Sequence, residues 1–274
     1  MPSGASGPEP SLPEGDTIYR AARTLAARLN GKEVLRFHST VPALVNARLE
    51  GTHVAGVEAR GKNLQVVFDD GRVLTTHMKM TGSWHVYHPG ERWFLPAHRA
   101  RAVIEVSDCV AVCFSAPVVE LHASAARLEQ ARLGKLGPDI LAPGFDATVA
   151  AARILSRPAL SLGEALLEQS LLSGIGNVYK SESLFLEHLS PFVASSTVPR
   201  ERLIALVARA ESLMKQNLAP GSGMRTTRGQ HAGASRHWVY RRSGEPCFVC
   251  ETTLEMRRQG ASLRSTYFCP RCQA

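Results

Sequence analysis

Four of the six cysteines form two closely spaced pairs near the end of the chain. Cys247 and Cys250 are separated by two residues, 18 residues follow, and Cys269 and Cys272 repeat the same spacing. Two Cys-x-x-Cys knuckles at this separation are typical of a tetrahedral zinc site, because each knuckle places two thiolates on one tight turn. The N-terminus shows no basic and apolar secretion signal, so we expect a reducing compartment, which disfavours disulfides. The pattern predicts one structural Zn²⁺ ion, with no open coordination position for chemistry.

The composition is that of an ordinary globular protein with an uneven charge distribution. Of the 274 residues, 44% are hydrophobic and 20% are charged, and no apolar run approaches the roughly 20 residues that span a bilayer. The net charge is +8, and residues 200–274, with 13 basic and 5 acidic residues, account for all of it. Twelve of those 13 basic residues are Arg, the residue suited to bidentate phosphate contacts. This asymmetry favours a nucleic-acid partner, although a solvated basic tail would have the same composition.

The pattern of turns and apolar positions divides the chain into segments. Residues 33–122 alternate short β-branched stretches with turns, whereas residues 146–218 have helical periodicity. Residues 134–145 are rich in Gly and Pro, and residues 219–237 in Gly, Ser, Thr and Arg. The predicted order is a disordered extension (1–12), a β-sandwich domain with a leading helix (13–133), a linker (134–145), a helical domain (146–218), a flexible segment (219–237) and a zinc ribbon (238–274).

Several elements can be predicted individually. A helix is expected to begin at Pro13 and to end at Asn30-Gly31, with Glu14 and Asp16 complementing its dipole. Asp70-Gly71 predicts a two-residue hairpin turn. The predicted strands are 54–58, 64–68, 73–77, 103–106 and 110–114, and the predicted helices after the linker are 160–172, 178–187 and 200–218.

A glycine-rich turn precedes one of these helices. Gly174, Gly176 and Asn177 place backbone N–H groups at a helix N-terminus, which is a geometry that binds phosphate. Taken alone the signal is weak, because glycines of this kind are common in plain turns.

Four blocks of sequence together resemble the formamidopyrimidine-DNA glycosylase and endonuclease VIII family of base-excision repair enzymes. The blocks run in the family's order and span nearly the whole chain. They are Pro-Glu-Gly-Asp-Thr (13–17), Arg-Gly-Lys-Asn (60–63), the stretch from Leu167 to Glu182 that contains Ser-Gly-Ile-Gly-Asn, and Arg-Ser-Thr-Tyr-Phe-Cys-Pro-Arg-Cys-Gln (264–273). The resemblance implies an α+β multidomain fold, with an N-terminal β-sandwich, a helix–two-turns–helix domain and a C-terminal zinc finger.

The resemblance also implies an activity and its catalytic residues. Family members flip a damaged base out of duplex DNA, cut its glycosidic bond with the amine of an N-terminal proline, and then break the backbone by elimination. Carried over to this sequence, the nucleophile is Pro13, Glu14 handles protons at the sugar, and Lys62 contacts a phosphate or donates a proton. An α-amino group has a pKa near 8, so an appreciable fraction is neutral at pH 7.

The DNA contacts implied by the resemblance lie in three places. Asn177 and Arg264 match positions that clamp the phosphates on either side of the lesion. The segment His-Met-Lys-Met-Thr-Gly (77–82) matches the part that fills the hole left by the flipped nucleotide, with Met80 as the apolar wedge. Lys79 in this segment and Lys180 in the glycine-rich block complete the expected DNA-binding residues.

The sequence departs from the family pattern at its start. Pro13 follows twelve residues, and inside a chain its nitrogen is an amide that cannot attack. We expect that translation begins at Leu12, whose codon can serve as a bacterial start and is then read as methionine, or that residues 1–12 are trimmed.

Further departures favour the endonuclease VIII branch, which mainly removes oxidised pyrimidines. The formamidopyrimidine branch carries a second glutamate where this chain has Thr17, and an intercalating Arg-Phe pair near residues 115–121, which here read Ser-Ala-Pro-Val-Val-Glu-Leu. A lysine expected before the glycine-rich block corresponds to Gly163.

The sequence therefore predicts a DNA glycosylase and AP lyase that acts, as a monomer, on double-stranded DNA with oxidised bases or abasic sites. We expect a bacterial cytoplasmic, nucleoid-associated enzyme with no membrane partner. Two alternatives remain at this point: a catalytically silent protein that binds damaged DNA, and a zinc-ribbon adaptor unrelated to repair.

Overall fold

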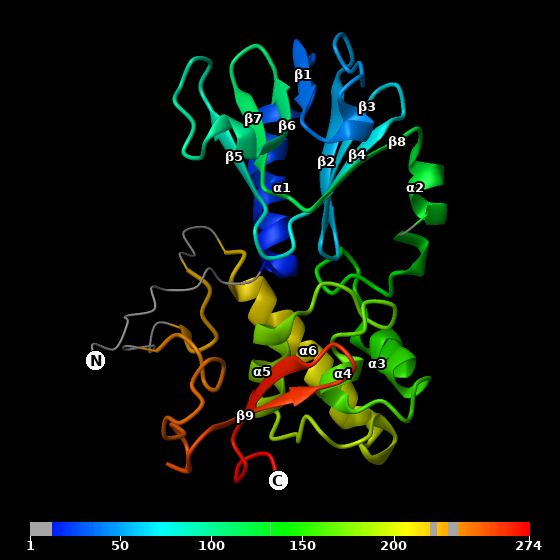
Figure 1. The fold of residues 1–274 in the computed structure, drawn as a ribbon. Coiled ribbons are helices and arrows are strands. Elements are labelled where there is room, and N and C mark those ends of the chain that lie inside the picture. Colours follow the sequence, from blue (N-terminus) through cyan, green and yellow to red (C-terminus); the bar gives the residue numbers. More distant parts are fainter. Residues whose placement is uncertain (1–12, 132, 220–223, 230–234) are drawn as a thin grey trace, which may run out of the picture. The chain divides into compact units, whose positions relative to one another are not determined.

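The computed structural model describes residues 13–131, 133–219, 224–229 and 235–274, and its chain forms two compact units (Figure 1). The first unit contains Pro13 and Thr17–Ala131, and the second contains Glu14–Asp16 and the chain from Arg132 to Ala274. The predictions for residues 1–12, and for 220–223 and 230–234 of the flexible segment, lie outside the described residues. Within the described part of the chain, no helix is long and apolar enough to cross a membrane.

The predicted N-terminal helix is confirmed as α1 (Gly15–Leu29). It begins two residues after Pro13, so that proline precedes the helix rather than occupying its first turn. Ile18, Leu25 and Leu29 recur at helical spacing and are buried in the core of the first unit. The first two helical residues, Gly15 and Asp16, belong to the second unit, while the rest of the helix belongs to the first.

The first unit is a β-sandwich of two antiparallel four-stranded sheets (Figure 1). One sheet has the order β1–β6–β7–β5 and the other β2–β3–β4–β8. Apolar residues of both sheets and of α1 form one buried core, so the predicted sandwich with a leading helix is confirmed. The strands are β1 (Arg36–Ser39), β2 (Val54–Arg60), β3 (Asn63–Phe68), β4 (Val73–His77), β5 (Ser83–Tyr87), β6 (Ala100–Glu105), β7 (Val110–Phe114) and β8 (Val118–His122), with short helices η1 (Pro42–Leu44), η2 (Ala97–Arg99) and α2 (Ala125–Ala131).

All five predicted strands are present, and three further strands, β1, β5 and β8, were not predicted. Residues 118–122 form β8 against β4, so in the stretch where the formamidopyrimidine branch carries its Arg-Phe pair only residues 115–117 lie between strands. The hairpin between β3 and β4 also differs from the prediction. Phe68 N–H donates to Arg72 O, and Gly71, with φ +87°, donates to Phe68 O, which is the pattern of a three-residue loop rather than a two-residue turn.

The second unit is helical and ends in a two-stranded hairpin (Figure 1). The predicted helix over residues 160–172 is wrong, because only 162–165 are helical. Glu168 accepts hydrogen bonds from the N–H and hydroxyl of Ser170, and such local bonds compete with the helical pattern. The elements are η3 (Leu133–Lys135), α3 (Ala147–Leu155), α4 (Leu162–Ala165), α5 (Asn177–Leu186), η4 (Ser195–Thr197), α6 (Arg200–Gln216), β9 (Glu255–Gln259) and β10 (Arg264–Phe268).

Residues 134–145, expected as a linker from their Gly and Pro content, pack within the second unit. Ile140 and Leu141 are buried, and Asp139 forms a β-bridge with Ser173. Ile140 N–H donates to Ser173 O, and Ser173 N–H donates to Pro138 O. This segment therefore holds the glycine-rich turn that precedes α5.

Candidate active site and metal centre

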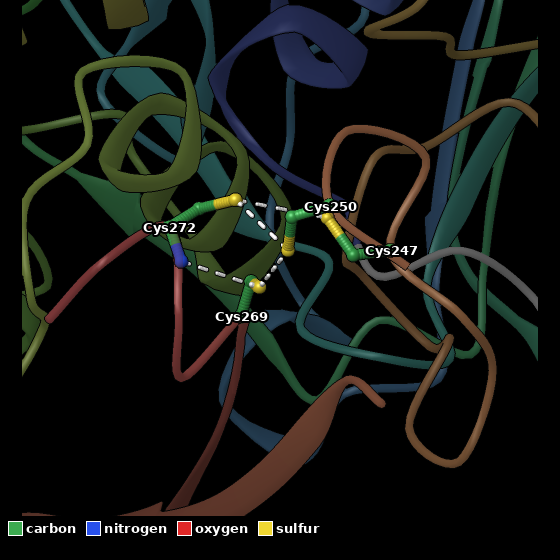
Figure 2. Close-up of side chains that lie close together, drawn as sticks. All are labelled: Cys247, Cys250, Cys269 and Cys272. Carbon is green, nitrogen blue, oxygen red and sulfur yellow. Dashed lines mark hydrogen bonds between the residues drawn. The ribbon is translucent and has the colours of Figure 1, made fainter. Parts of the chain in front are cut away.

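The four paired cysteines converge at one place in the second unit (Figure 2). Their sulfur atoms all lie within 4.8 Å of one another. Cys250 Sγ is 3.3 Å from Cys272 Sγ and 3.4 Å from Cys269 Sγ, and Cys247 Sγ is 3.9 Å from Cys272 Sγ. Four sulfurs at about 2.3 Å from a zinc ion in tetrahedral geometry lie about 3.8 Å apart, so these residues fit the ion. The predicted structural zinc site is confirmed.

The knuckles support the thiolates and the hairpin between them. Val249 N–H donates to Cys247 Sγ and Cys272 N–H donates to Cys269 Sγ, both at 3.4 Å. β9 and β10 connect the two knuckles, and Arg264 is exposed at the first position of β10. Because four thiolates would close the coordination shell, a zinc ion bound by these cysteines would hold this hairpin and its arginine in place and would supply no reacting group.

Glu14 is buried, with 1% of its surface exposed, and its carboxylate lies at the N-terminus of α5. Its two oxygens accept hydrogen bonds from the N–H groups of Gly176 at 2.9 Å, Val178 at 2.8 Å and Tyr179 at 3.4 Å. The N-terminus of a helix carries partial positive charge and unpaired N–H groups, so it stabilises a carboxylate there. Glu14 therefore caps a helix that follows it by more than 160 residues in sequence.

This arrangement gives the glycine-rich turn a partner within the protein. Its N–H groups were a weak signal for phosphate binding, and in the structure those of Gly176, Val178 and Tyr179 donate to the carboxylate of Glu14. A Cβ at Gly176 would lie 2.4 Å from Glu14 Cδ, so the glycine is required for this close approach. The side chain of Asn177 remains half-buried at the start of α5, and its Oδ1 has no hydrogen-bond partner among the described residues.

Two residues beyond Glu14, a second buried carboxylate has partners that the sequence did not indicate. Asp16 accepts hydrogen bonds from Arg225 Nη2 at 2.6 Å, from Arg225 Nε at 2.9 Å and from the hydroxyl of Tyr179 at 2.9 Å. Arg225 is 5% exposed, and its guanidinium lies 5.3 Å from the centre of the Tyr179 ring. Burial raises the pKa of Tyr179, and the charge of Asp16 raises it further.

Sequence reasoning missed this cluster for a physical reason. Asp16 was assigned only to the dipole of its own helix, and Arg225 lies in a segment whose composition predicts mobility. The described part of that segment is instead anchored, since Asn217 Nδ2 donates to Thr226 O at 2.8 Å and Thr226 N–H donates to Asn217 Oδ1 at 2.9 Å. A buried arginine among small polar residues carries no periodicity that a sequence pattern could reveal.

Lys180, expected to contact DNA, is fully buried on α5. Its ammonium donates to Ser265 O at 3.0 Å and to Thr266 Oγ1 at 2.7 Å, both on β10. Burial lowers the pKa of Lys180 to about 7, with Glu14 opposing this shift and Arg264 adding to it. In this structure the ammonium holds the zinc hairpin against α5 and does not reach solvent.

A small pocket of about 280 Å³ lies beside this lysine, between α4 and the hairpin. Lys180, Arg264, Gly163 and Gln259 are among its lining residues. A Cβ at Gly163 would come within 2.3 Å of Gln259 Oε1. The side chain of Gln259 therefore occupies the space next to position 163, where the family pattern has a lysine.

The other candidate residues, Lys62, Lys79 and Met80, lie at one end of the β2–β3–β4–β8 sheet in the first unit. Lys62 is in the two-residue turn between β2 and β3, and Met80 follows β4. Because Asn63 at the start of β3 pairs with His77 at the end of β4, both turns lie at the same end of the sheet. Met80 is 62% exposed, and Lys79 beside it is exposed too.

The described turn that carries Met80 is well supported. Gly82 N–H donates to Met78 O at 2.8 Å, Lys79 N–H donates to His77 Nδ1 at 3.1 Å, and the Thr81 hydroxyl donates to Ser115 O at 3.0 Å. Met78 is buried under the turn. The backbone therefore presents Met80 outward while it buries the methionine two residues earlier.

Family models match three consecutive parts of the chain. Residues 12–117 match the N-terminal domain of formamidopyrimidine-DNA glycosylase, residues 136–228 match its H2TH domain, and residues 244–274 match the zinc finger found in this glycosylase and in isoleucyl-tRNA synthetase. These three segments correspond to the sandwich, the helical part and the zinc hairpin of the structure.

Proteins of known name match over nearly the full length. A probable endonuclease 8 2 of Streptomyces coelicolor is 39% identical over 268 residues, which cover 96% of this chain and 94% of that protein. The DNA-(apurinic or apyrimidinic site) lyase Nei2 of Mycolicibacterium smegmatis is 33% identical over 96% of this chain and 99% of its own length. Among solved structures, the formamidopyrimidine-DNA glycosylase of Lactococcus lactis bound to DNA containing an AP site superposes with a TM-score of 0.79 at 21% identity, over 95% of this chain and 99% of that chain.

Fold, zinc centre and sequence thus define a DNA-repair glycosylase with an associated lyase activity. The chain belongs to the formamidopyrimidine-DNA glycosylase and endonuclease VIII family, and the relatives above carry endonuclease 8 and AP-lyase names. The resemblance seen in the four sequence blocks is confirmed.

Proposed function

We propose that this enzyme excises oxidised bases, chiefly pyrimidines, from double-stranded DNA and then cleaves the strand at the abasic site. The main observation behind the proposal is that the Glu14 carboxylate is hydrogen-bonded to the N-terminus of α5, because Glu14 directly follows the proline that would react. The preference for pyrimidines is supported by the endonuclease 8 names of relatives and by Thr17 in place of a second glutamate.

In the proposed reaction the secondary amine of Pro13 attacks C1′ of the sugar. The glycosidic bond breaks, the base leaves with a proton, and the proline nitrogen gives up its own proton. The C1′–O4′ bond then breaks as O4′ takes a proton, which opens the sugar ring and leaves an iminium ion between the proline nitrogen and C1′. The iminium acidifies the C2′–H bond, so removal of that proton expels the 3′ phosphate. Glu14 is the residue placed to hold or move protons at the sugar. The mechanism requires that the acting chain begin at Pro13, through a start at Leu12 or through trimming.

The remaining site residues are proposed to hold the DNA. Asn177 and Arg264, together with Lys62, would contact phosphates around the lesion, and Met80 with Lys79 would enter the space left by the flipped nucleotide. Both Arg264 and Met80 are exposed, which such contacts require. Lys180 would act indirectly, since it holds β10 and therefore Arg264. We further propose that the enzyme works as a monomer in the cytoplasm of a bacterium, associated with the nucleoid.

Borohydride trapping on a duplex with an abasic site tests this proposal. Two forms of the protein should be compared, one that begins at Pro13 and one that retains residues 1–12. The form that begins at Pro13 is expected to give a covalent adduct, which mass spectrometry places on the proline nitrogen. The longer form is expected to bind the duplex without forming the adduct.

Four outcomes would count against the proposal. Cleavage by the chain that retains residues 1–12, or an adduct on a lysine such as Lys62, would exclude the proline route. Binding by both forms without any adduct would favour a silent damage-binding protein, and equal affinity for intact and damaged duplexes would favour an adaptor. A panel of duplexes with defined oxidised purines and pyrimidines then tests the base preference, which faster excision of the purines would contradict.

A further inference from the structure

Glu14, Gly15 and Asp16 belong to the second unit and are each hydrogen-bonded within it, although α1, which begins at Gly15, continues into the first unit. Glu14 binds the N–H groups of α5, Gly15 N–H donates to Gly174 O at 2.9 Å, and Asp16 binds Arg225 and Tyr179. The residue next to the proposed nucleophile is therefore positioned through three successive anchors. Two of them depend on buried charged side chains.

Arg225 is the cation shared by both carboxylates. Its Nη2 lies 2.6 Å from Asp16 Oδ1, and its Nη1 lies 4.0 Å from Glu14 Oε1. Burial disfavours the charged guanidinium, but the charges of Glu14 and Asp16 outweigh this and raise the pKa of Arg225. The arginine therefore remains a fixed positive charge between two acids.

The fork of the guanidinium explains why an arginine suits this place. Nε and Nη2 reach the two oxygens of Asp16 together, which fixes the plane of the guanidinium, and Nη1 then faces Glu14. The Tyr179 hydroxyl donates to the same carboxylate, and its backbone N–H donates to Glu14. Tyr179 thus connects both acids through one residue of α5.

We propose that Asp16 and Arg225 are positioning residues that act through Glu14 on the reaction at Pro13. This inference rests on the proposed function, because it assigns a role within that reaction. Removal of the guanidinium would leave two acids near each other in a buried site and would free the Glu14 carboxylate to shift from the N-terminus of α5. Displacement of a reacting group by about 1 Å can cost on the order of 100-fold in rate.

The alternative is that the pair only stabilises the fold. Buried ion pairs often contribute little net stability, while loss of one partner is costly because a charge is left unpaired. A fall in activity alone would therefore not separate the two roles. A double-mutant cycle with Glu14 does, because a residue that acts through Glu14 has no further effect once the Glu14 carboxylate is gone.

The experiment uses the chain that begins at Pro13 and measures single-turnover strand cleavage at an abasic site under saturating protein. Arg225→Met and Asp16→Asn are each made alone and together with Glu14→Gln. Affinity is measured on a duplex with a stable abasic-site analogue. Each single variant is expected to cleave about 10- to 100-fold more slowly with affinity changed less than about 3-fold, and each double variant is expected to match Glu14→Gln alone. Arg225→Lys, which keeps the charge but not the fork, is expected to recover part of the rate.

Arg242→Met is the matched control, since Arg242 is also buried and ion-paired, with Glu245, but makes no contact with Glu14 or Asp16. The rate loss caused by Arg242→Met should multiply with the rate loss caused by Glu14→Gln in the double variant. If the rate losses of Arg225→Met and Asp16→Asn also multiply with that of Glu14→Gln, or if these variants lose only affinity, the inference is overturned. Cleavage by the wild-type chain would still leave the proposed function standing. If Arg225→Met does not fold, the near-isosteric Asp16→Asn decides the question alone. Absence of cleavage by the wild-type chain would overturn both.

Discussion

Glu14 combines two demands that a single residue rarely meets. A buried carboxylate is costly unless its charge is compensated, and here the compensation comes from the N-terminus of α5 and from Arg225. The same bonds fix its position next to residue 13. The interactions that hold this carboxylate on α5 therefore also fix it beside residue 13, where the proposed reaction needs it.

Replacement of Glu14 by Gln tests this residue directly. The amide is of similar size and can accept one N–H bond, but it carries no charge and exchanges no proton. We expect base excision to fall by at least about 100-fold while affinity for lesion-containing DNA is retained. Excision assays and binding to a stable abasic-site duplex measure the two effects. Glu58→Gln, an exposed acid on β2, is the control, and normal excision by Glu14→Gln would remove this residue from the mechanism.

Gly176→Ala tests the close approach between the turn and Glu14. The added methyl would lie 2.4 Å from Glu14 Cδ, so the carboxylate must move off the helix N-terminus. We expect a loss of about 1–3 kcal/mol in unfolding free energy, together with slow excision. Gly56→Ala is the matched control, because a Cβ there meets no atom within 4 Å. Denaturant unfolding of both variants checks the difference, and equal stabilities would contradict the proposed packing.

Among the elements, the sequence predicted best those whose signal is local. The runs of β-branched residues in β3, β4 and β7 are buried almost throughout, so their pattern alone identified them. β1 has no β-branched residue, β5 has one, and β8 has two followed by Glu-Leu-His, so none contains a long apolar run. Each is defined by its pairing with a neighbouring strand instead. The four zinc ligands were predictable because the Cys-x-x-Cys spacing along the chain already places two thiolates on one tight turn. The contact of Glu14 with the N-terminus of α5 and the Asp16–Arg225 ion pair were not predictable, since each joins residues far apart in sequence.

We expect the zinc hairpin to need its metal, because the apolar cluster around the ligands is small and includes two of the cysteines themselves. Cys269→Ser should release the ion, unfold the hairpin and abolish DNA binding, because Arg264 then loses its fixed position. Metal analysis and DNA-binding titrations measure both effects. Cys109→Ala, at a buried thiol of the first unit, should keep one zinc per chain. Unchanged affinity in zinc-free Cys269→Ser protein would refute the positioning role of the metal.

At the scale of the whole molecule, stability should depend on pH through a half-buried histidine. Burial lowers the pKa of His237 to about 4, and the charges of Arg225, Arg236 and Arg241 add to this. In the unfolded chain the ordinary value is near 6.5, so between these two values the unfolded state binds more protons and the folded state is destabilised as the pH falls. The cost reaches up to about 3 kcal/mol near pH 4.

His237→Gln should therefore flatten the dependence of unfolding free energy on pH between 6.5 and 4.5. Denaturant unfolding with excess zinc across this range measures the slope. His98→Gln, at an exposed histidine, should keep the wild-type slope. An identical slope in His237→Gln would show that His237 is not the group responsible.

The last prediction follows from the distribution of charge along the whole chain. All of the +8 net charge lies in residues 200–274, which include the zinc hairpin. Each protein cation that neutralises a phosphate releases counterions, so affinity for duplex DNA should fall steeply with salt. Arg264→Ala is expected to reduce the slope of log affinity against log salt by about 1, and to weaken binding similarly for different sequences. Arg48→Ala is the control. Arg48 O accepts a hydrogen bond from Arg72, so Arg48 lies at the end of the sheet opposite to Lys62 and Met80. If Arg264→Ala leaves the slope unchanged while Arg48→Ala lowers it, the DNA lies against the opposite end of the sandwich and not along the zinc hairpin.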